Sequence, residues 1–242
     1  QISPRAGLTY QLSDAVLLYS NYAEGFLPLS GTDYAGKAFE PERSESVELG
    51  AKGQWHDWRW RAAWFAAEKS NILVSDPLNV GFSATLGAAQ SRGLELELTG
   101  ALGNSTSLNL AYSYLDSETL TDAVNIDWGV LVPKGSALVN IPRHTLSAQL
   151  QQQFSLAGRD SATGLRLRYQ SQRLGDAVVP DFQLPSHTLW HWFVTHRLTA
   201  AWQAELVIEN LFDKSWIQSA YSALWTYPGE PRTSRLSLRY DF

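Results

Sequence analysis

The chain ends with RTSRLSLRYDF, Arg232 to Phe242, and this stretch decides the fold class. Charged or small polar residues alternate along it with four apolar ones: Leu236, Leu238, Tyr240 and Phe242. Successive side chains of a β-strand point to opposite faces, so one face of this segment is apolar and the other is polar. The stretch therefore predicts a terminal strand that separates two environments of different polarity.

The same two-residue period recurs along most of the chain. It is clearest at 6–10, 58–64, 94–98, 108–114, 146–150, 165–169 and 202–208. Alternation over such lengths is typical of strands with one apolar and one polar face, and helical periodicity is nowhere convincing. These runs, with weaker ones between them, predict an all-β chain of about eleven antiparallel strands.

The connections between the predicted strands alternate in length. Tight turns are expected near 13–14, 56–57, 103–104, 158–160 and 198–199. Long connections are expected at roughly 25–43, 70–88, 117–141, 174–186 and 211–231. Short turns at one rim and long loops at the other are the organisation of outer-membrane barrels. We therefore expect an antiparallel transmembrane β-barrel.

Composition narrows the classes of function. The chain has 242 residues, a formal net charge of −5 and no Cys. The acidic balance argues against a nucleic-acid partner. The lack of Cys excludes disulfides, thiolate metal sites and Cys nucleophiles. No run approaches the roughly 18 apolar residues of a membrane-spanning helix, so a membrane crossing has to use strands.

Two observations predict that the chain is part of a longer protein. It contains no Met, and Gln1 to Pro4 show neither the basic nor the apolar region of a signal peptide. About eleven strands is also an odd number, whereas single-chain bacterial barrels have an even number. We expect residues 1–242 to form the C-terminal portion of a barrel whose first strands and N-terminal domain precede Gln1.

A series of short motifs covers essentially the whole chain. The motifs lie at 3–8, 18–26, 41–52, 91–97, 141–144, 210–214 and 228–233. They include Asn-Leu-Phe-Asp-Lys at 210–214 and Pro-Gly-Glu-Pro-Arg-Thr at 228–233. In this order, and with the aromatic terminal strand, the chain resembles the barrel of TonB-dependent outer-membrane siderophore receptors of the ferric hydroxamate or ferrichrome type.

The resemblance implies a barrel of about 22 strands in the bacterial outer membrane, closed by an N-terminal plug. It implies uptake of a ferric siderophore, with the siderophore and not the protein binding the iron, and hence no cofactor or metal site. It implies four partners: the siderophore, outer-membrane lipid, the TonB complex through the plug, and the barrel-assembly machinery. The barrel-assembly machinery would recognise the terminal strand, in which Leu236, Leu238, Tyr240 and Phe242 form the assembly signal.

Aromatic residues on the long connections are the candidate ligand contacts. The set is Tyr34, Phe82, Trp128, Tyr221, Trp225 and Tyr227. Aromatic walls suit a bulky chelate because rings offer a large contact area at low entropy cost. The alternative, that these rings only pack the loops on one another, stays open. The strand tryptophans at 55, 58, 60, 64, 190, 192 and 202 fit an interfacial girdle instead.

No residue set carries an enzyme signature. Glu95 and Glu97 share a strand face about 6.6 Å apart, a spacing that also suits glycosidase carboxylates. We expect them to be lumen charges matched to Arg on neighbouring strands. His187 and His191 would lie about 13 Å apart, too far to share a metal. The alternatives to a receptor are a passive porin and, less favoured, an outer-membrane hydrolase.

Overall fold

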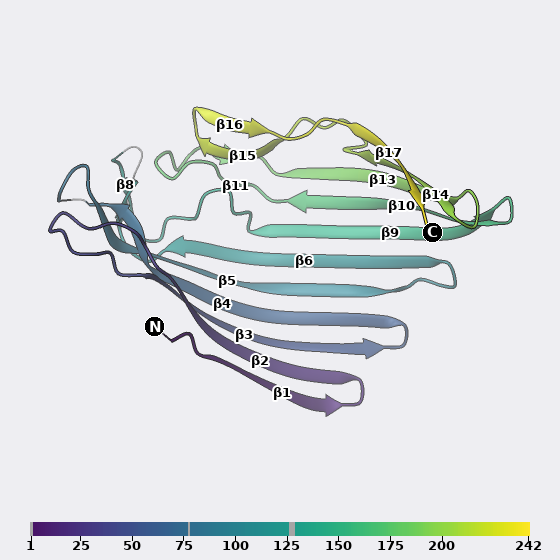
Figure 1. Ribbon diagram of the computed structural model, residues 1–242, viewed down its shortest axis with the longest axis horizontal. Helices are drawn as coiled ribbons and strands as arrows, with labels where there is room; N and C mark the ends of the chain where they lie inside the picture. The colour runs from purple at the N-terminus through teal and green to yellow at the C-terminus, as the bar shows by residue number, and fades with distance from the viewer. Residues whose placement is uncertain (1, 77, 126–128) are drawn as a thin grey trace.

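Eleven long strands run as one antiparallel meander through the computed structural model, which describes residues 2–76, 78–125 and 129–242. They are β1 (Arg5–Ser13), β2 (Val16–Leu27), β3 (Glu42–Trp55), β4 (Trp58–Ser75), β5 (Ser83–Ala101), β6 (Thr106–Thr119), β9 (His144–Leu156), β10 (Arg159–Gln170), β13 (His187–Arg197), β14 (Trp202–Glu209) and β17 (Thr233–Tyr240). Each strand pairs with the next one along this path (Figure 1). The all-β, antiparallel prediction is therefore confirmed.

The five expected tight turns are all present, and they lie together at one end of the sheet, on the right in Figure 1. We call this end the turn rim and the opposite end the loop rim. The turn between β9 and β10 consists of Ala157 and Gly158, with φ of 52° and 73°. Two-residue hairpin loops favour positive φ at both positions, because that twist matches the flanking strands.

One expected long connection is much shorter than predicted. The sequence suggested a loop over 70–88, but β4 runs to Ser75 and β5 begins at Ser83. The polar run around Asn71 interrupts the alternation and hides this strand extension from the sequence. The ladder nevertheless continues, with register shifts on either side of Ile72. A bulge adds a residue without ending the pairing, so the sheet extends further toward the loop rim.

The terminal strand also ends earlier than its sequence pattern. β17 stops at Tyr240, and the last ladder pair joins Tyr240 to Trp202. Asp241 still donates its backbone amide to the carbonyl of Ala201 at 2.9 Å, whereas Phe242 is fully exposed. Strand ends fray where the partner strand turns away, which here happens at 198–201.

Short secondary elements within the long connections were not predicted. β7 (Ala123–Val124) pairs with β8 (Leu131–Val132) and with β4, and β11 (Arg173–Leu174) pairs with β12 (Gln183–Leu184). β15 (Ile217–Ser222) and β16 (Trp225–Pro228) form a separate hairpin. Elements of two to six residues are too short for periodicity to identify.

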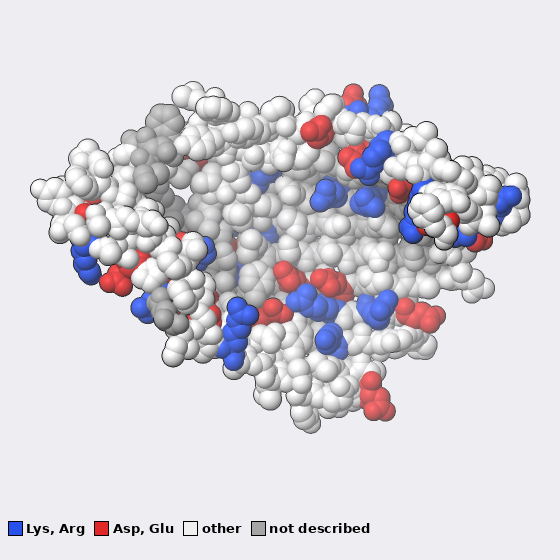
Figure 2. All heavy atoms as spheres, viewed as in Figure 1, with Lys and Arg blue, Asp and Glu red and all other residues white. Residues whose placement is uncertain are grey.

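The ladder registers assign every strand residue to one of two faces. Leu49, Trp64, Leu94 and Tyr114 stand opposite one another across β3 to β6 on the outer face. The other face, which we call the lumen face, lines the hollow of the curved sheet, and Figure 2 shows Lys, Arg, Asp and Glu side chains along it. The outer face is apolar and exposed over much of its area, as in a wall that meets lipid.

The wall is a single layer without a conventional core. Leu184, at the loop rim, is the largest side chain that is fully buried in the described ranges. Many large apolar side chains are instead exposed, among them Leu8, Leu49, Leu96 and Leu236. No helix occurs in the described part of the chain, so none there could cross a membrane.

β1 and β17 form the two edges of the sheet. Within the described residues, each has a ladder partner on one side only, β2 for β1 and β14 for β17. All residues of β1 are exposed. An unpaired edge is a row of free backbone donors and acceptors. Both edges are therefore suited to pairing with further strands.

Candidate ligand-binding site

Three of the predicted aromatic residues lie together on the β15–β16 hairpin at the loop rim. The ring centroids of Tyr221 and Trp225 are 6.3 Å apart, and those of Trp225 and Tyr227 are 6.4 Å apart. Their exposed fractions are 52%, 60% and 47%. We call these three residues the hairpin cluster. These rings are therefore accessible from the solvent around the loop rim.

Two more predicted aromatics meet on the other side of the loop rim. Tyr34, on the connection between β2 and β3, stands edge-on to Phe82, on the connection between β4 and β5. Their ring centroids are 5.1 Å apart, with an interplanar angle of 87°. The sixth predicted residue, Trp128, lies outside the described residues. The structure thus brings five of the predicted contacts into two separate groups.

A short turn positions Phe82. The carboxylate of Asp76 accepts backbone hydrogen bonds from Leu78 at 2.8 Å and Asn79 at 3.1 Å. It also accepts one at 2.8 Å from the Asn79 side chain, and this contact is the main reason that the pKa of Asp76 is held below its usual value. Phe82 then donates its amide to the carbonyl of Asn79 and accepts one from Asp76. The turn is most stable with the carboxylate ionised.

The hairpin cluster rests on side chains from two other connections. Asn140, before β9, donates to the carbonyl of Ala220 at 2.7 Å and accepts its amide at 2.9 Å. Asp176, after β11, accepts the amide of Ala223 at 2.8 Å. These bonds satisfy backbone groups of β15 and of the turn that follows it. They hold the hairpin in one orientation at the loop rim.

Arg173 provides the third support for the hairpin. Its Nη2 donates to the carbonyls of Ile217 at 3.0 Å and Gln218 at 2.8 Å. The residue is 3% exposed, and burial lowers the pKa of its guanidinium. No sequence signal pointed to Arg173, because its partners are backbone groups more than forty residues away.

The Asn-Leu-Phe-Asp-Lys motif forms the base of the same connection. Asn210 is buried, with φ of 48°, and its side chain exchanges hydrogen bonds with the backbone of Lys214. Its amide also donates to the carbonyl of Glu230 at 3.1 Å. Asn tolerates positive φ better than most residues and can bond to nearby backbone. The motif therefore closes the loop that carries the hairpin cluster.

On the lumen face, Glu95 and Glu97 are matched to an arginine as predicted. Arg61 lies 3.7 Å from Glu95, 3.4 Å from Glu97 and 2.9 Å from Glu48. Tyr19 accepts a bond from Arg61 at 2.9 Å and donates to Glu48 at 2.7 Å. One guanidinium shared by three carboxylates makes this an ion-pair network of the wall.

The outer face carries the predicted tryptophans and the apolar residues of the terminal strand β17. By ladder register, Trp55, Trp58, Trp60, Trp64, Trp190, Trp192 and Trp202 all belong to this face. Trp202 and Tyr240 are neighbours near the turn rim, with ring centroids 5.0 Å apart. Leu236 and Leu238 share the face and are exposed. The outward placement of these residues is confirmed.

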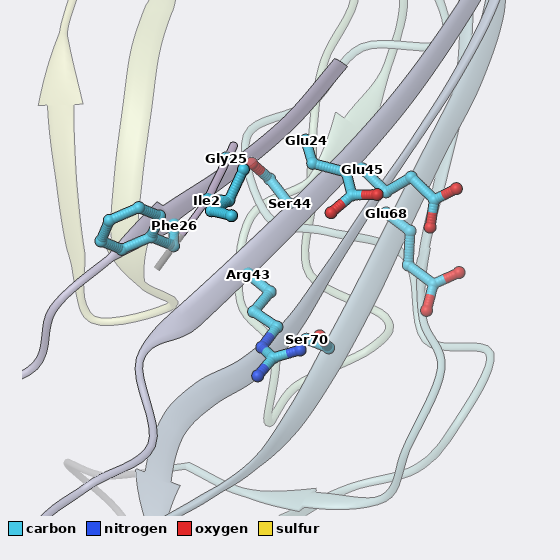
Figure 3. Close-up of a pocket in the computed structure, with 9 residues that line it drawn as sticks. All are labelled: Ile2, Glu24, Gly25, Phe26, Arg43, Ser44, Glu45, Glu68 and Ser70. Atoms are coloured by element: carbon cyan, nitrogen blue, oxygen red, sulfur yellow. The ribbon is translucent and has the colours of Figure 1, made fainter. Parts of the chain in front are cut away.

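An acidic row on the outer face was not predicted. Glu24, Glu45 and Glu68 are direct ladder neighbours on β2, β3 and β4, and Figure 3 shows their carboxylates side by side. They line a pocket of about 280 Å³ together with Arg43, which forms no ion pair with them in the described structure. The phenol of Tyr22 donates to Glu24 at 2.6 Å. This row faces away from the hollow and is not part of the candidate ligand site.

These features define the class of protein. A meander of antiparallel strands with an apolar outer face, a charged hollow, short turns at one rim and long loops at the other is the wall of an outer-membrane β-barrel. Residues 1–211 match the family described as TonB dependent receptor-like, beta-barrel. The chain belongs to this family, whose barrels lie in the bacterial outer membrane.

Curated relatives are receptors. The chain is 34% identical over 245 residues to the metal-pseudopaline receptor CntO of Pseudomonas aeruginosa, covering 99% of this chain and 33% of that protein. It is 28% identical over 241 residues to the ferrichrome outer membrane transporter/phage receptor of Escherichia coli, covering 96% of this chain and 31% of that protein. The chain thus spans about a third of the length of these relatives.

Solved structures have the same fold. The ferripyoverdine receptor of the Pseudomonas aeruginosa outer membrane superimposes with a TM-score of 0.80 at 22% identity, over 99% of this chain and 33% of that chain. The siderophore receptor PiuA of Acinetobacter baumannii gives a TM-score of 0.79 at 23% identity, over 98% of this chain and 35% of that chain.

Proposed function

We propose that this chain forms part of the barrel of an outer-membrane receptor that imports ferric siderophores with energy supplied through TonB. The observation that carries the proposal is the family match over residues 1–211 on a wall of this architecture. Relatives named as receptors for ferrichrome, ferrioxamine B and metal-pseudopaline support a metal chelate as the cargo.

The aromatic groups at the loop rim would capture the chelate. Tyr221 and Trp225 are exposed, and the hairpin that carries them is fixed by Asn140, Arg173 and Asp176. A rigid aromatic surface binds a bulky organic ligand with little loss of side-chain entropy. The second group, Tyr34 and Phe82, would contact another side of the same ligand. Iron would be coordinated by the siderophore, and the protein would act as a receptor and transporter without catalysing a reaction.

The remaining parts of the transporter belong to the proposal as well. Further strands would pair with the free edges β1 and β17, giving a closed barrel of about 22 strands, and a plug in the hollow would contact TonB. The barrel-assembly machinery would recognise the outward residues of the terminal strand, and these residues would contact lipid in the assembled barrel.

The test is uptake by cells that express the full-length receptor. Radiolabelled ferric siderophores should accumulate in cells with TonB, and deletion of the receptor's TonB-contacting segment should abolish accumulation while leaving surface binding intact. A matched strain without the receptor is the control. Uptake that persists without TonB would instead support a passive porin, and the absence of both binding and uptake for every siderophore tried would refute the proposal.

A further inference from the structure

Cations gather without carboxylate partners where the lumen face of β10, β13 and β14 reaches the loop rim. Arg166 and Arg168 project from the lumen face of β10, Arg173 begins β11, and Lys214 follows β14. None of the four forms an ion pair with a carboxylate in the described part of the chain. Arg61, on the other side of the hollow, has three such partners.

Arg166 and Arg173 donate hydrogen bonds to neutral groups, while Glu95 and Glu97 line the same hollow as Arg168 without forming an ion pair with it. Arg166 donates to the neutral Gln149 at 3.0 Å and lies 5.9 Å from the centre of the Phe193 ring. The side chains of Arg168 and Lys214 are exposed. Charged groups on a lumen wall that lack partners are free to bind charge on whatever occupies the lumen.

A pocket opens beside these cations. It has a volume of about 310 Å³ and is lined by Pro185, Ser186, His187, Lys214, Ser215, Trp216 and Ile217. The rings of His187 and Trp216 form one wall, with centroids 4.6 Å apart at 38°. Lys214 places an ammonium group at the same pocket. The pocket thus combines an aromatic surface with a positive charge.

Two buried nitrogens near this pocket have no hydrogen-bond partner among the described residues. His187 is 5% exposed, and its Nδ1 makes no hydrogen bond. Arg173 contacts the pocket residue Ile217 through Nη2, while its buried Nη1 makes no hydrogen bond. Buried polar groups are nearly always paired in folded proteins, so the unpaired Nη1 of Arg173, which can only donate, marks a place where an acceptor is missing. An anionic acceptor could pair with this nitrogen and with the ammonium group of Lys214 at the pocket.

From this geometry we infer that the pocket and the arginines next to it bind an anionic metal chelate through its free carboxylate groups. The inference rests on the proposed receptor function and specifies its substrate class. Guanidinium and ammonium groups make short, strong hydrogen bonds with carboxylates, and arginine does so with two parallel bonds. Trp216 takes the apolar part of the chelate. Arg168 and Arg166 lie further along the lumen face of β10, two and four residues from Gln170, the ladder partner of His187.

The test uses the full-length receptor in detergent and two ferric probes. One is a neutral tris-hydroxamate complex, and the other is a complex of similar size with free carboxylates. The receptor should bind the carboxylate probe more tightly, and salt should weaken only that binding. Lys214→Gln and Arg168→Gln should each weaken it by about tenfold, the scale of a hydrogen bond to a charged group. Neither change should affect the neutral probe.

Two control variants test whether a loss of binding comes from the loss of positive charge at the pocket or from a change in the structure of the protein. Arg59→Gln removes an arginine from the same face near the turn rim and should leave both affinities unchanged, while Lys214→Arg should retain binding of the carboxylate probe. Equal binding of both probes with no effect of the variants would overturn the inference and leave the receptor function intact. A loss of thermal stability without a loss of affinity would also overturn it, because the cations would then pair with another part of the receptor. Failure to bind either probe would reject the substrate class and count against the proposed function itself.

Discussion

Asn140 and Ala220 lie 80 positions apart in the chain, and two hydrogen bonds join them. The asparagine side chain donates to the alanine carbonyl and accepts from its amide, as a neighbouring strand would. This pair connects the loop before β9 to the hairpin that carries Tyr221 and Trp225. The aromatic surface proposed to bind the siderophore is therefore positioned from outside its own loop.

The first prediction concerns this pair. Asn140→Ala leaves the backbone groups of Ala220 without partners and should destabilise the hairpin by about 1 to 3 kcal/mol. Hydrogen exchange of the β15 amides in the full-length receptor measures the effect. Asn104→Ala, in an exposed turn at the opposite rim, is the control and should not change that exchange. Unchanged protection of β15 in the Asn140 variant would show that Arg173 and Asp176 suffice to hold the hairpin.

The second prediction concerns the hairpin cluster. Replacing Tyr221 and Trp225 together by Ala should weaken binding of a ferric siderophore by about 1 to 3 kcal/mol, the scale expected when anchor aromatics are truncated. Barrel assembly should be unaffected, because both side chains are exposed on a loop hairpin. Equilibrium binding over a panel of ferric siderophores is the measurement, with Trp55→Ala at the turn rim as control. Unaltered affinity for every siderophore that the parent binds would assign these rings to loop packing.

The third prediction tests the two faces of the wall. Leu238 is 61% exposed on the outer face, whereas Arg239 points to the lumen face and bonds to Asp241 at 2.8 Å. Leu238→Arg places a cation toward lipid and should cost about 1 to 3 kcal/mol, between the costs expected at the interface and at the midplane of the bilayer. Arg239→Leu should cost far less, since it removes only an exposed ion pair. Heat-modifiability of the assembled receptor gives the ranking, and the reverse order would mean that the faces are exchanged.

The fourth prediction tests which rim faces outward. An epitope inserted after Leu224, between β15 and β16, should be reached by antibody on intact cells, because long loops face the outside. An epitope between Gly158 and Arg159, in the two-residue turn of the opposite rim, should be reached only after the outer membrane is opened. Labelling of the second site and not the first on intact cells would invert the topology.

The strands of the wall and their two faces could be predicted from the amino-acid pattern alone. The two-residue period predicted the strands and assigned Glu95, Trp64 and Leu238 to their faces, because the side-chain direction in a strand depends only on position along the chain. The positions of the tight turns were also predictable to within about two residues: the turn expected at 158–160 lies at Ala157 and Gly158. The motif series further indicated the family that the comparison with known proteins shows.

The arrangement of the loop rim, in contrast, could not be predicted and became visible only in the folded chain. The extension of β4 to Ser75 depends on bulges that the polar run around Asn71 conceals. The support of the hairpin by Asn140 and Arg173, and the pocket that brings His187 beside Trp216, join residues distant in sequence. Such contacts leave no periodic trace, because they depend on where each loop folds back over the wall and not on the residues next to them. The wall follows from local repetition, whereas the site depends on non-local contacts.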